Sequence, residues 1–183
     1  MAEIEIQIEV EDISQALAEI ARRLEDLTPA FRRIKGVMLD AAEENFAQQG
    51  RPRWVDLAPA TKKQRAKQGS WPGSILQRTG GLAASIVGDS GRDYATVGTN
   101  KEYAAIHQFG GEIRQFAQAR FVDFRIDRQG RSRFAKRRDA NFSQAVTFQA
   151  RTIPIPARPF LSFTEGDQEE MLACFAGFLS ENL

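Results

Sequence analysis

The chain has very few of the side chains from which catalytic and metal sites are built. Its 183 residues include one histidine, His107, and one cysteine, Cys174. Zinc sites need several His or Cys ligands, and a reactive Cys–His pair needs a local context that neither residue has. Walker-type loops, dinucleotide fingerprints and nucleophile-elbow motifs are also absent from the sequence. We therefore expect a non-enzymatic protein with no catalytic residue, no cofactor and no metal site.

Long hydrophobic runs and a large excess of one charge are missing as well. No stretch has the length of a membrane span, and the acidic first twelve residues do not resemble a secretion signal. The 25 Lys and Arg nearly balance the 24 Asp and Glu, which argues against a protein built mainly to coat nucleic acid. A length of 183 residues suits one domain, 1–183, made in a reducing cytosol or used in a particle assembled there.

Hydrophobic periodicity predicts helices near both ends of the chain and short strands between them. Residues 4–10 alternate between apolar and polar, which predicts a strand, and helical spacing then follows over 13–27 and 28–49. The remaining signals predict strands at 94–98, 121–126 and 146–148, a helical turn at 103–109 and a closing helix at 167–179. This order predicts an α+β fold, with helices packed on a small, mostly antiparallel sheet.

Residues 51–74 break this periodicity and are expected to form a long loop with a small helix, which Thr61 could cap. The loop contains both tryptophans, Trp54 and Trp71. Large aromatic rings serve equally well as interface anchors and as lids on a small core, and both roles stay open.

Proline and histidine mark two further positions. Pro154 lies in an alternating Ile-Pro stretch, 153–156, that cannot form a central strand because proline donates no ladder hydrogen bond. Two prolines stiffen the chain around Arg158, next to Phe160, which lowers the entropy cost of either folding or docking. His107 is expected to be a hydrogen-bonded structural side chain rather than a switch.

The strongest charge asymmetry lies in a segment that we call the basic arm, residues 112–150. Its first part, 112–138, has nine Lys and Arg against three Asp and Glu, a local net charge of +6. The arginines of the basic arm that we take as candidate interaction residues are Arg114, Arg120, Arg125, Arg128, Arg131, Arg133, Arg137 and Arg138. The phenylalanines between them are Phe116, Phe121, Phe124 and Phe134. Guanidinium groups suit carboxylate or phosphate partners, and the rings add hydrophobic anchors.

Three roles are open for the basic arm. It can be a solvated hairpin whose phenylalanines pack back on the body, a docking element for an acidic surface of a neighbouring subunit, or a contact for DNA. Salt-sensitive binding to duplex DNA would separate the last role from the others, because neutralised phosphates release counterions.

Four short motifs stand in a fixed order along the chain. They are residues 54–57 (Trp-Val-Asp-Leu) with Thr61, 75–82 (Ile-Leu-Gln-Arg-Thr-Gly-Gly-Leu) with Ser85 and Ile86, 97–111 (Val-Gly-Thr-Asn-Lys-Glu-Tyr-Ala-Ala-Ile-His-Gln-Phe-Gly-Gly) and 155–161 (Ile-Pro-Ala-Arg-Pro-Phe-Leu). In combination they resemble the phage virion morphogenesis family, which includes Mu G-like and P2-type tail-completion proteins. The resemblance runs from about residue 30 to the C-terminus. The opening strand at 4–10 and the Arg-rich insertion after Gly111 do not map onto the family pattern.

The resemblance implies a structural protein that completes the phage tail and helps to form the head–tail junction, or neck, as a ring-forming subunit. The implied partners are copies of itself in a ring, a hexamer by family analogy, together with connector or neck proteins and tail-tube or tail-terminator proteins, with no membrane. It also implies a place in the virion, in the tail or neck, after assembly in the bacterial cytoplasm. The candidate interaction residues are Trp54, Trp71, Arg158, Phe160 and the eight arginines of the basic arm.

Two other functions compete with this one. A DNA-contacting head-completion or channel protein would lose DNA retention, and keep its rings, when Arg131, Arg133, Arg137 and Arg138 are neutralised. A small hydrolase with an unrecognised site would bring Asp, Ser and His107 together in a pocket.

Overall fold

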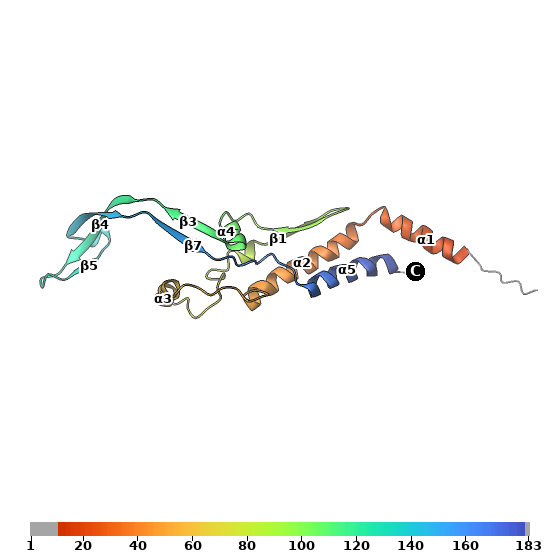
Figure 1. Cartoon of the computed structure of the whole chain (residues 1–183), viewed down its shortest axis with the longest axis horizontal. Helices are drawn as coiled ribbons and strands as arrows, with labels where there is room; N and C mark the ends of the chain where they lie inside the picture. The colour runs from red at the N-terminus through yellow and green to blue at the C-terminus, as the bar shows by residue number, and fades with distance from the viewer. Residues whose placement is uncertain (1–10, 182–183) are drawn as a thin grey trace, which may run out of the picture. The chain divides into compact units, whose positions relative to one another are not determined.

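The computed structural model of the chain describes residues 11–181, so the strand predicted at 4–10 lies outside the described residues (Figure 1). The helices are α1 (Glu11–Leu24), α2 (Thr28–Gln48), α3 (Pro59–Lys67), α4 (Ala104–Phe109) and α5 (Glu165–Ser180), with 3-10 turns at Ala83–Ser85 and Arg137–Asp139. The strands are β1 (Val87–Ser90), β2 (Ala95–Gly98), β3 (Gly111–Gln115), β4 (Gln118–Ile126), β5 (Ser132–Phe134), β6 (Phe142–Phe148) and β7 (Arg151–Ile155). The predicted α+β class is confirmed.

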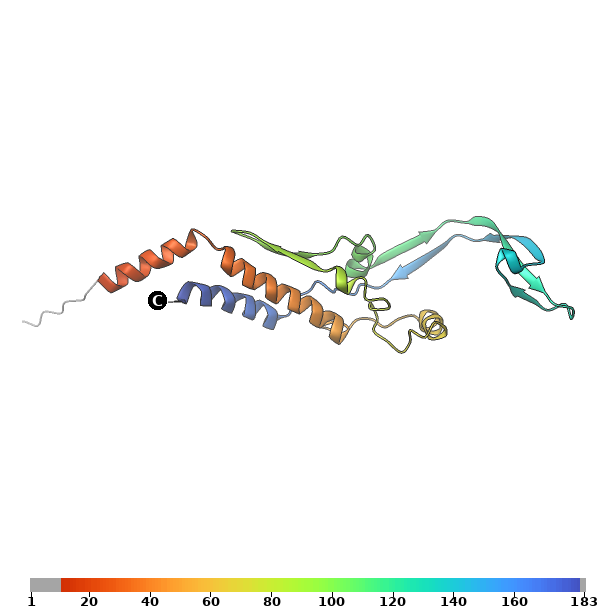
Figure 2. The ribbon, with the colours of Figure 1, turned by 180° about the vertical axis from the view of Figure 1, so that it is seen from behind.

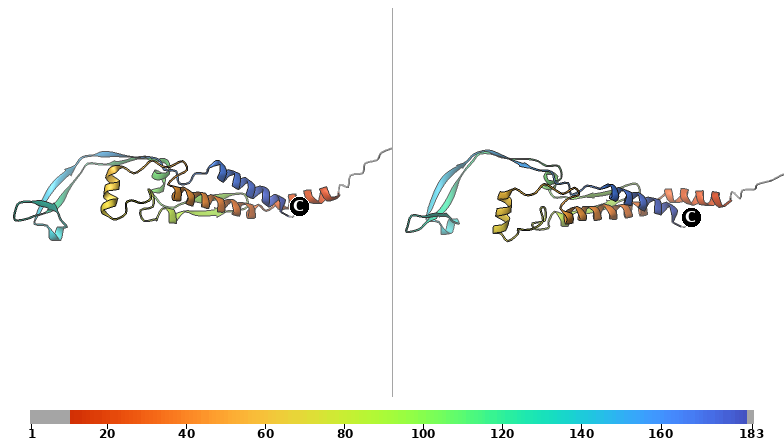
Figure 3. Two further views of the ribbon diagram at one scale, coloured as in Figure 1. Left: turned by 90° about the horizontal axis from the view of Figure 1, so that it is seen from below. Right: turned by 60° about the horizontal axis from the view of Figure 1, so that its bottom comes forward.

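The strands form three small antiparallel sheets. β1 pairs with β2, β3 pairs with β7, and the third sheet has the order β5-β4-β6. Pro154 lies opposite Glu112 in the two-stranded β3–β7 ribbon, where both strands are edges, so it is not in a central strand, as predicted. The ribbon runs into the three-stranded sheet in both views of Figure 3.

The contacts within the chain group into two units. The body unit comprises Met1–Phe109 and Ala157–Leu183, and the arm unit comprises Gly110–Pro156 and contains the basic arm. These units describe how contacts group along the chain; the single folding domain over 1–183, with excursions at 51–74 and 112–150, stays a prediction.

Helix α2 is the central element of the body unit. It packs between α5 and the β1–β2 hairpin, as Figure 2 shows from behind. Its start agrees with the predicted range 28–49, with Thr28 first and Pro29 in the first turn, where proline loses no hydrogen bond. Thr28 does not cap the helix, because the N-cap is Leu27 and no side chain accepts a cap hydrogen bond. It ends at Gln48, and the chain turns away at Gly50, whose φ of +101° favours glycine and where a Cβ atom would collide with the Trp54 ring.

Helix α3 begins one turn earlier than the loop sequence predicted. Its first residue is Pro59 and its N-cap is Ala58, which makes no side-chain cap hydrogen bond. The expectation that Thr61 caps this helix is therefore wrong, because proline at the first position sets the start of the helix.

Helix α5 begins with a reciprocal hydrogen-bond pair. The Thr164 backbone N–H donates to Asp167 Oδ2 at 2.7 Å, and the Asp167 N–H donates to Thr164 Oγ1 at 3.3 Å. This capping box satisfies two backbone donors at the start of the helix. The same carboxylate accepts both Arg51 Nη1 and Nη2 at 3.0 Å, which ties the end of α2 to the start of α5.

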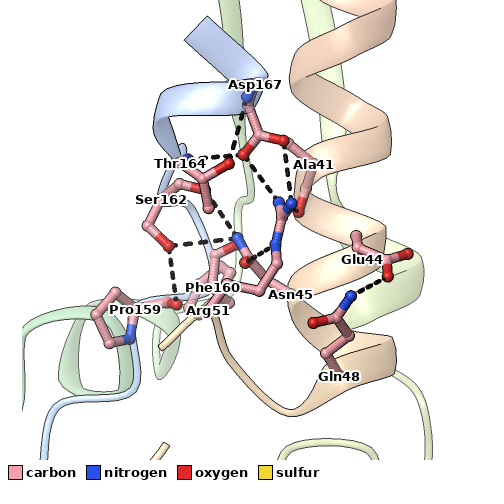
Figure 4. Close-up of polar contacts among 10 residues, drawn as sticks. All are labelled: Ala41, Glu44, Asn45, Gln48, Arg51, Pro159, Phe160, Ser162, Thr164 and Asp167. Atoms are coloured by element: carbon pink, nitrogen blue, oxygen red, sulfur yellow. Dashed lines mark hydrogen bonds and ion pairs between the residues drawn. The ribbon is translucent and has the colours of Figure 1, made fainter. Parts of the chain in front are cut away.

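A buried amide completes this polar network, which Figure 4 shows in close-up. Asn45 has no exposed surface; its Nδ2 donates to the carbonyl oxygens of Phe160 (3.1 Å) and Ser162 (2.8 Å). Its Oδ1 accepts Arg51 Nε at 3.0 Å. The network therefore joins α2, the segment before α5 and α5 itself through satisfied polar groups.

Acid should loosen this junction. Burial alone raises the pKa of Asp167, but the Thr164 N–H and the Arg51 guanidinium outweigh burial and hold the pKa below its ordinary value. A carboxylate with a lowered native pKa stabilises the fold above its unfolded pKa of about 4, and this contribution is lost as the pH falls through the native pKa. We expect unfolding midpoints to fall below about pH 4, and Asp167→Asn to remove part of that dependence while lowering stability at neutral pH. An unchanged acid dependence in Asp167→Asn contradicts this role.

Candidate interaction surface

The four sequence motifs meet in the core of the body unit. Its buried cluster comprises Phe46, Trp54, Ile75, Leu82, Ala104 and Phe160, so each motif supplies at least one member. The Trp54 ring meets Phe46 edge-on with centroids 5.9 Å apart, and the Phe46 and Phe160 centroids are 5.5 Å apart. Trp54 Nε1 also donates to the Pro159 carbonyl at 2.9 Å. The motifs thus encode a core.

Three of the candidate interaction residues are therefore not at the surface. Trp54, Arg158 and Phe160 are 6%, 5% and 1% exposed. Of the two roles left open for Trp54, the structure supports the core lid, and we correct the expected surface role of all three. Trp71 is half-buried, with Lys62 Nζ 5.3 Å from its ring centroid, and its expected contact role stays a prediction.

Arg158 is buried because the backbone satisfies its guanidinium. Its Nε donates to the Val55 carbonyl at 2.8 Å and its Nη2 to the Asp56 carbonyl at 3.1 Å. Its backbone N–H donates to the His107 carbonyl at 2.7 Å. Burial, with nearby Arg65, lowers the pKa of Arg158, and Asp56 opposes that shift. Arg158 therefore joins the 51–74 loop to the segment that precedes α5.

His107 differs from the sequence expectation. Its buried Nδ1 has no hydrogen-bond partner among the described residues, so the expected hydrogen bond is wrong for that atom. Burial, with the charge of Arg158, lowers the pKa of His107, which favours a neutral ring packed 6.2 Å from the Tyr103 ring. Within residues 11–181 no Asp or Ser side chain hydrogen-bonds to this ring, so the convergence expected of a hydrolase does not occur there.

In the arm unit, strand register gathers aromatic side chains on one face. Phe124 lies opposite Phe134 on one neighbouring strand and opposite Phe142 on the other, and directly opposed residues share a face. The Phe124 ring stacks on Phe134 at 5.1 Å and lies 6.3 Å from Phe142. Phe134 is 79% exposed. We call the β4, β5 and β6 sheet the arm sheet, and this side its apolar face.

All eight candidate arginines of the basic arm are exposed. Some have local partners: Arg131 Nε pairs with Asp127 at 2.8 Å, and the Arg120 guanidinium lies 4.6 Å from the Phe148 ring centroid. The side chains of Arg128, Arg133 and Arg137 make no hydrogen bond or ion pair with any described residue. The basic arm therefore presents exposed guanidinium groups beside an apolar face.

The two units differ in charge. The arm unit has ten Lys and Arg against four Asp and Glu, a net charge of +6, and the rest of the chain has fifteen against twenty, a net charge of −5. Each chain therefore carries two sets of opposite charge, which favours attraction between copies.

Helix α1 adds a second exposed apolar surface. Its predicted stripe is present, but Ile13, Leu17 and Leu24 are each at least half exposed. The stripe is therefore left uncovered by the described residues of the chain. Exposed apolar stripes of this kind mark protein contacts more often than isolated apolar residues do.

Sequence reasoning missed the residues that connect the motifs. Gln108 Oε1 accepts the backbone N–H groups of Phe160 and Leu161, each at 3.0 Å, and its Nε2 donates to the Leu161 carbonyl at 3.1 Å. Asn45, on α2, donates to the Phe160 and Ser162 carbonyls of the same segment. The only available signal was a polar residue on an otherwise apolar helical stripe, one position before Phe46.

Neither a membrane-spanning helix nor a cluster of metal ligands occurs among the described residues. No helix of residues 11–181 has the length and apolarity needed to cross a membrane. Within the same residues, no group of three or more His, Cys, Asp and Glu side chains is placed to hold a metal ion.

Comparison with known proteins identifies the family. The model of the phage virion morphogenesis family matches residues 8–180. The Mu-like prophage FluMu G protein 2 of Haemophilus influenzae is 34% identical over 172 residues, which cover 94% of this chain and 91% of that protein. The putative capsid assembly protein G of Escherichia phage Mu is 35% identical over 113 residues, 60% of this chain and 72% of that protein. No solved structure matches the chain. A structural role in phage assembly is supported, and the chain belongs to the phage virion morphogenesis family.

Proposed function

We propose that this protein is a non-enzymatic subunit that completes the phage tail and helps to form the head–tail junction by assembling into a ring. The observation that carries this proposal is the arm sheet, where exposed arginines surround an uncovered aromatic face in a member of a virion morphogenesis family. Surfaces that combine Arg and aromatic side chains are typical of protein interfaces.

The charge distribution supports contact between copies. Each chain pairs an arm unit of net charge +6 with a remainder of net charge −5, so the arm of one copy suits an acidic surface of the next. Contacts between two different surfaces of the same chain are heterologous, and they close into rings when the rotation allows it. A hexamer is the favoured number by analogy with the family, with connector or neck proteins and tail-tube or tail-terminator proteins as further neighbours.

Contact with DNA is the second candidate function. It is favoured by Arg128, Arg133 and Arg137, whose exposed guanidinium groups have no partner among the described residues. Binding to duplex DNA that weakens steeply as salt rises, and that disappears on neutralising these residues, would support this function over docking on protein.

A phage that lacks this protein provides the test of tail completion. We expect such a phage to accumulate tailless, DNA-filled heads alongside free tails, because a structural joint is missing while each part still forms. Electron microscopy of the particles distinguishes the outcomes. Finished tails on empty heads would instead favour the DNA-contacting function, and normal particles would contradict both. The protein is proposed to reside in the tail or neck of the virion after assembly in the host cytoplasm.

A further inference from the structure

One edge of the arm sheet lacks the features that usually prevent an edge strand from pairing with another chain. β6 is an outer strand of the sheet, and its sequence, Phe-Ser-Gln-Ala-Val-Thr-Phe, contains no charged residue and no proline. Natural edge strands are usually short, bulged or marked by lysine or proline, because their unpaired backbone groups accept strands from other molecules. β6 has seven residues, whereas the opposite edge, β5, has three. β6 is therefore an open site for an added strand.

The two sides of β6 specify what kind of strand fits. Phe142, Gln144, Val146 and Phe148 alternate along it on the apolar face of the arm sheet. The other side of β6 carries Ser143, Ala145 and Thr147. On the strands beyond it, Phe121, Arg125 and Arg133 lie on that side, with the two arginines opposite each other. Asp123 lies on that side as well and accepts the Ser143 hydroxyl. Small residues next to the edge leave room for a long acidic side chain to approach Arg125, which is on the adjacent strand, β4; Arg133 is one strand further away, on β5.

The chain contains a segment with the matching pattern. Residues 3–10 alternate strictly, with Ile4, Ile6, Ile8 and Val10 between Glu3, Glu5, Gln7 and Glu9. Such alternation is typical of a strand with one apolar and one polar side. Its eight residues match the seven of β6, and the first twelve residues of the chain carry five acidic and no basic residues.

We propose that residues 3–10 of one copy add as a strand to the free edge of β6 in a second copy. The isoleucines would extend the apolar face, and the glutamates would lie on the side of the sheet that carries Arg125 and Arg133. Backbone hydrogen bonds would supply affinity and the alternating side chains would supply register, as in other strand-addition complexes. Every copy has one such segment and one such edge, so the contact can repeat from copy to copy. This inference rests on the proposed function for the closure of these contacts into a ring.

Proline in the segment provides the first test. We expect the full chain carrying Ile6→Pro and Gln7→Pro to associate with itself about a hundredfold more weakly. Adjacent residues point their N–H groups to opposite sides of a strand, so one of the two prolines must remove a donor to β6. Ile6→Val with Gln7→Thr is the matched control, since it keeps the alternation of apolar and polar residues. The mass of the full-length protein, measured by light scattering across a concentration series, gives the result. Equal unfolding midpoints in all three proteins show that the fold is intact.

Charge reversal tests whether the segment acts between copies. One variant carries Glu3→Lys, Glu5→Lys and Glu9→Lys, and the other carries Arg125→Glu and Arg133→Glu. Each variant alone should remain largely monomeric because its segment and its edge repel. An equal mixture should assemble again, because each segment then meets an edge of opposite charge on the other protein. Pairing within one chain, in contrast, would leave the mixture as two monomers and would overturn the proposal.

The outcomes separate this inference from the proposed function. Oligomers that survive the proline substitutions contradict strand addition but agree with the proposed ring. The free edge of β6 would then serve another partner. A parent protein that stays monomeric throughout the concentration series, and also within particles, contradicts both.

Discussion

Replacing Phe160 with alanine is expected to lower the free energy of unfolding by about 3–5 kcal/mol. The ring is 1% exposed and packs against Phe46 in the cluster where the four motifs meet. Its removal leaves a cavity beside the Trp54 ring, whose indole is held by the Pro159 carbonyl and cannot easily move to fill it. Urea denaturation at neutral pH measures the loss.

Phe109 supplies the matched control for this substitution. It is the same residue type in the same unit, but it is 79% exposed. Phe109→Ala should change the free energy of unfolding by no more than about 0.5 kcal/mol. Similar losses for the two variants would contradict the position of the core.

Reversing three arginines of the basic arm is expected to abolish assembly without unfolding the protein. Arg128→Glu, Arg133→Glu and Arg137→Glu together change the net charge of the arm unit from +6 to 0. These side chains are exposed and unpaired among the described residues, so each substitution should alter stability by no more than about 0.5 kcal/mol. An interface that depends on the basic arm would meet like charges instead of opposite ones.

The yield of infectious particles measures the effect of this reversal. We expect the variant phage to produce as few infectious particles as a phage that lacks the protein. Reversal of Arg32, Arg92 and Lys101 in the body unit makes the same change in net charge at exposed positions and serves as the control. Equally low yields from the two triple variants would show that net charge matters and that its position in the basic arm does not. A normal yield from the basic-arm variant would contradict the prediction.

Local sequence signals predicted the elements whose stability is local. Helical spacing predicted 28–49 and 167–179, and the structure has α2 at Thr28–Gln48 and α5 at Glu165–Ser180. Those signals depend on backbone capping and on one apolar stripe, which a short window of sequence contains. The strands β1, β3, β5 and β7 were not predicted, because their pairing is decided by partner strands. In β3 the partner is distant: Gly111 pairs with Ile155, 44 residues later, and Gln115 with Arg151, 36 residues later.

The candidate interaction residues also divide into those whose surroundings depend on distant parts of the chain and those whose exposure follows from the local sequence. Arg158 was a candidate interaction residue for which folding and docking were both open, but the carbonyls of Val55 and Asp56, more than 100 residues earlier in the chain, satisfy it. Nothing near Arg158 in the sequence carries that information. The exposed arginines of the basic arm were correctly placed at the surface, since a dense run of charge in a short segment cannot be satisfied internally.

We propose that this protein works by joining copies of itself at the end of a phage tail. The sharpest test is to count its copies in finished particles, by quantitative mass spectrometry against a structural protein of known copy number. We predict a fixed set of several copies per particle, equal to the number in the ring seen at the neck or tail end. A single copy per particle, or none, would contradict it.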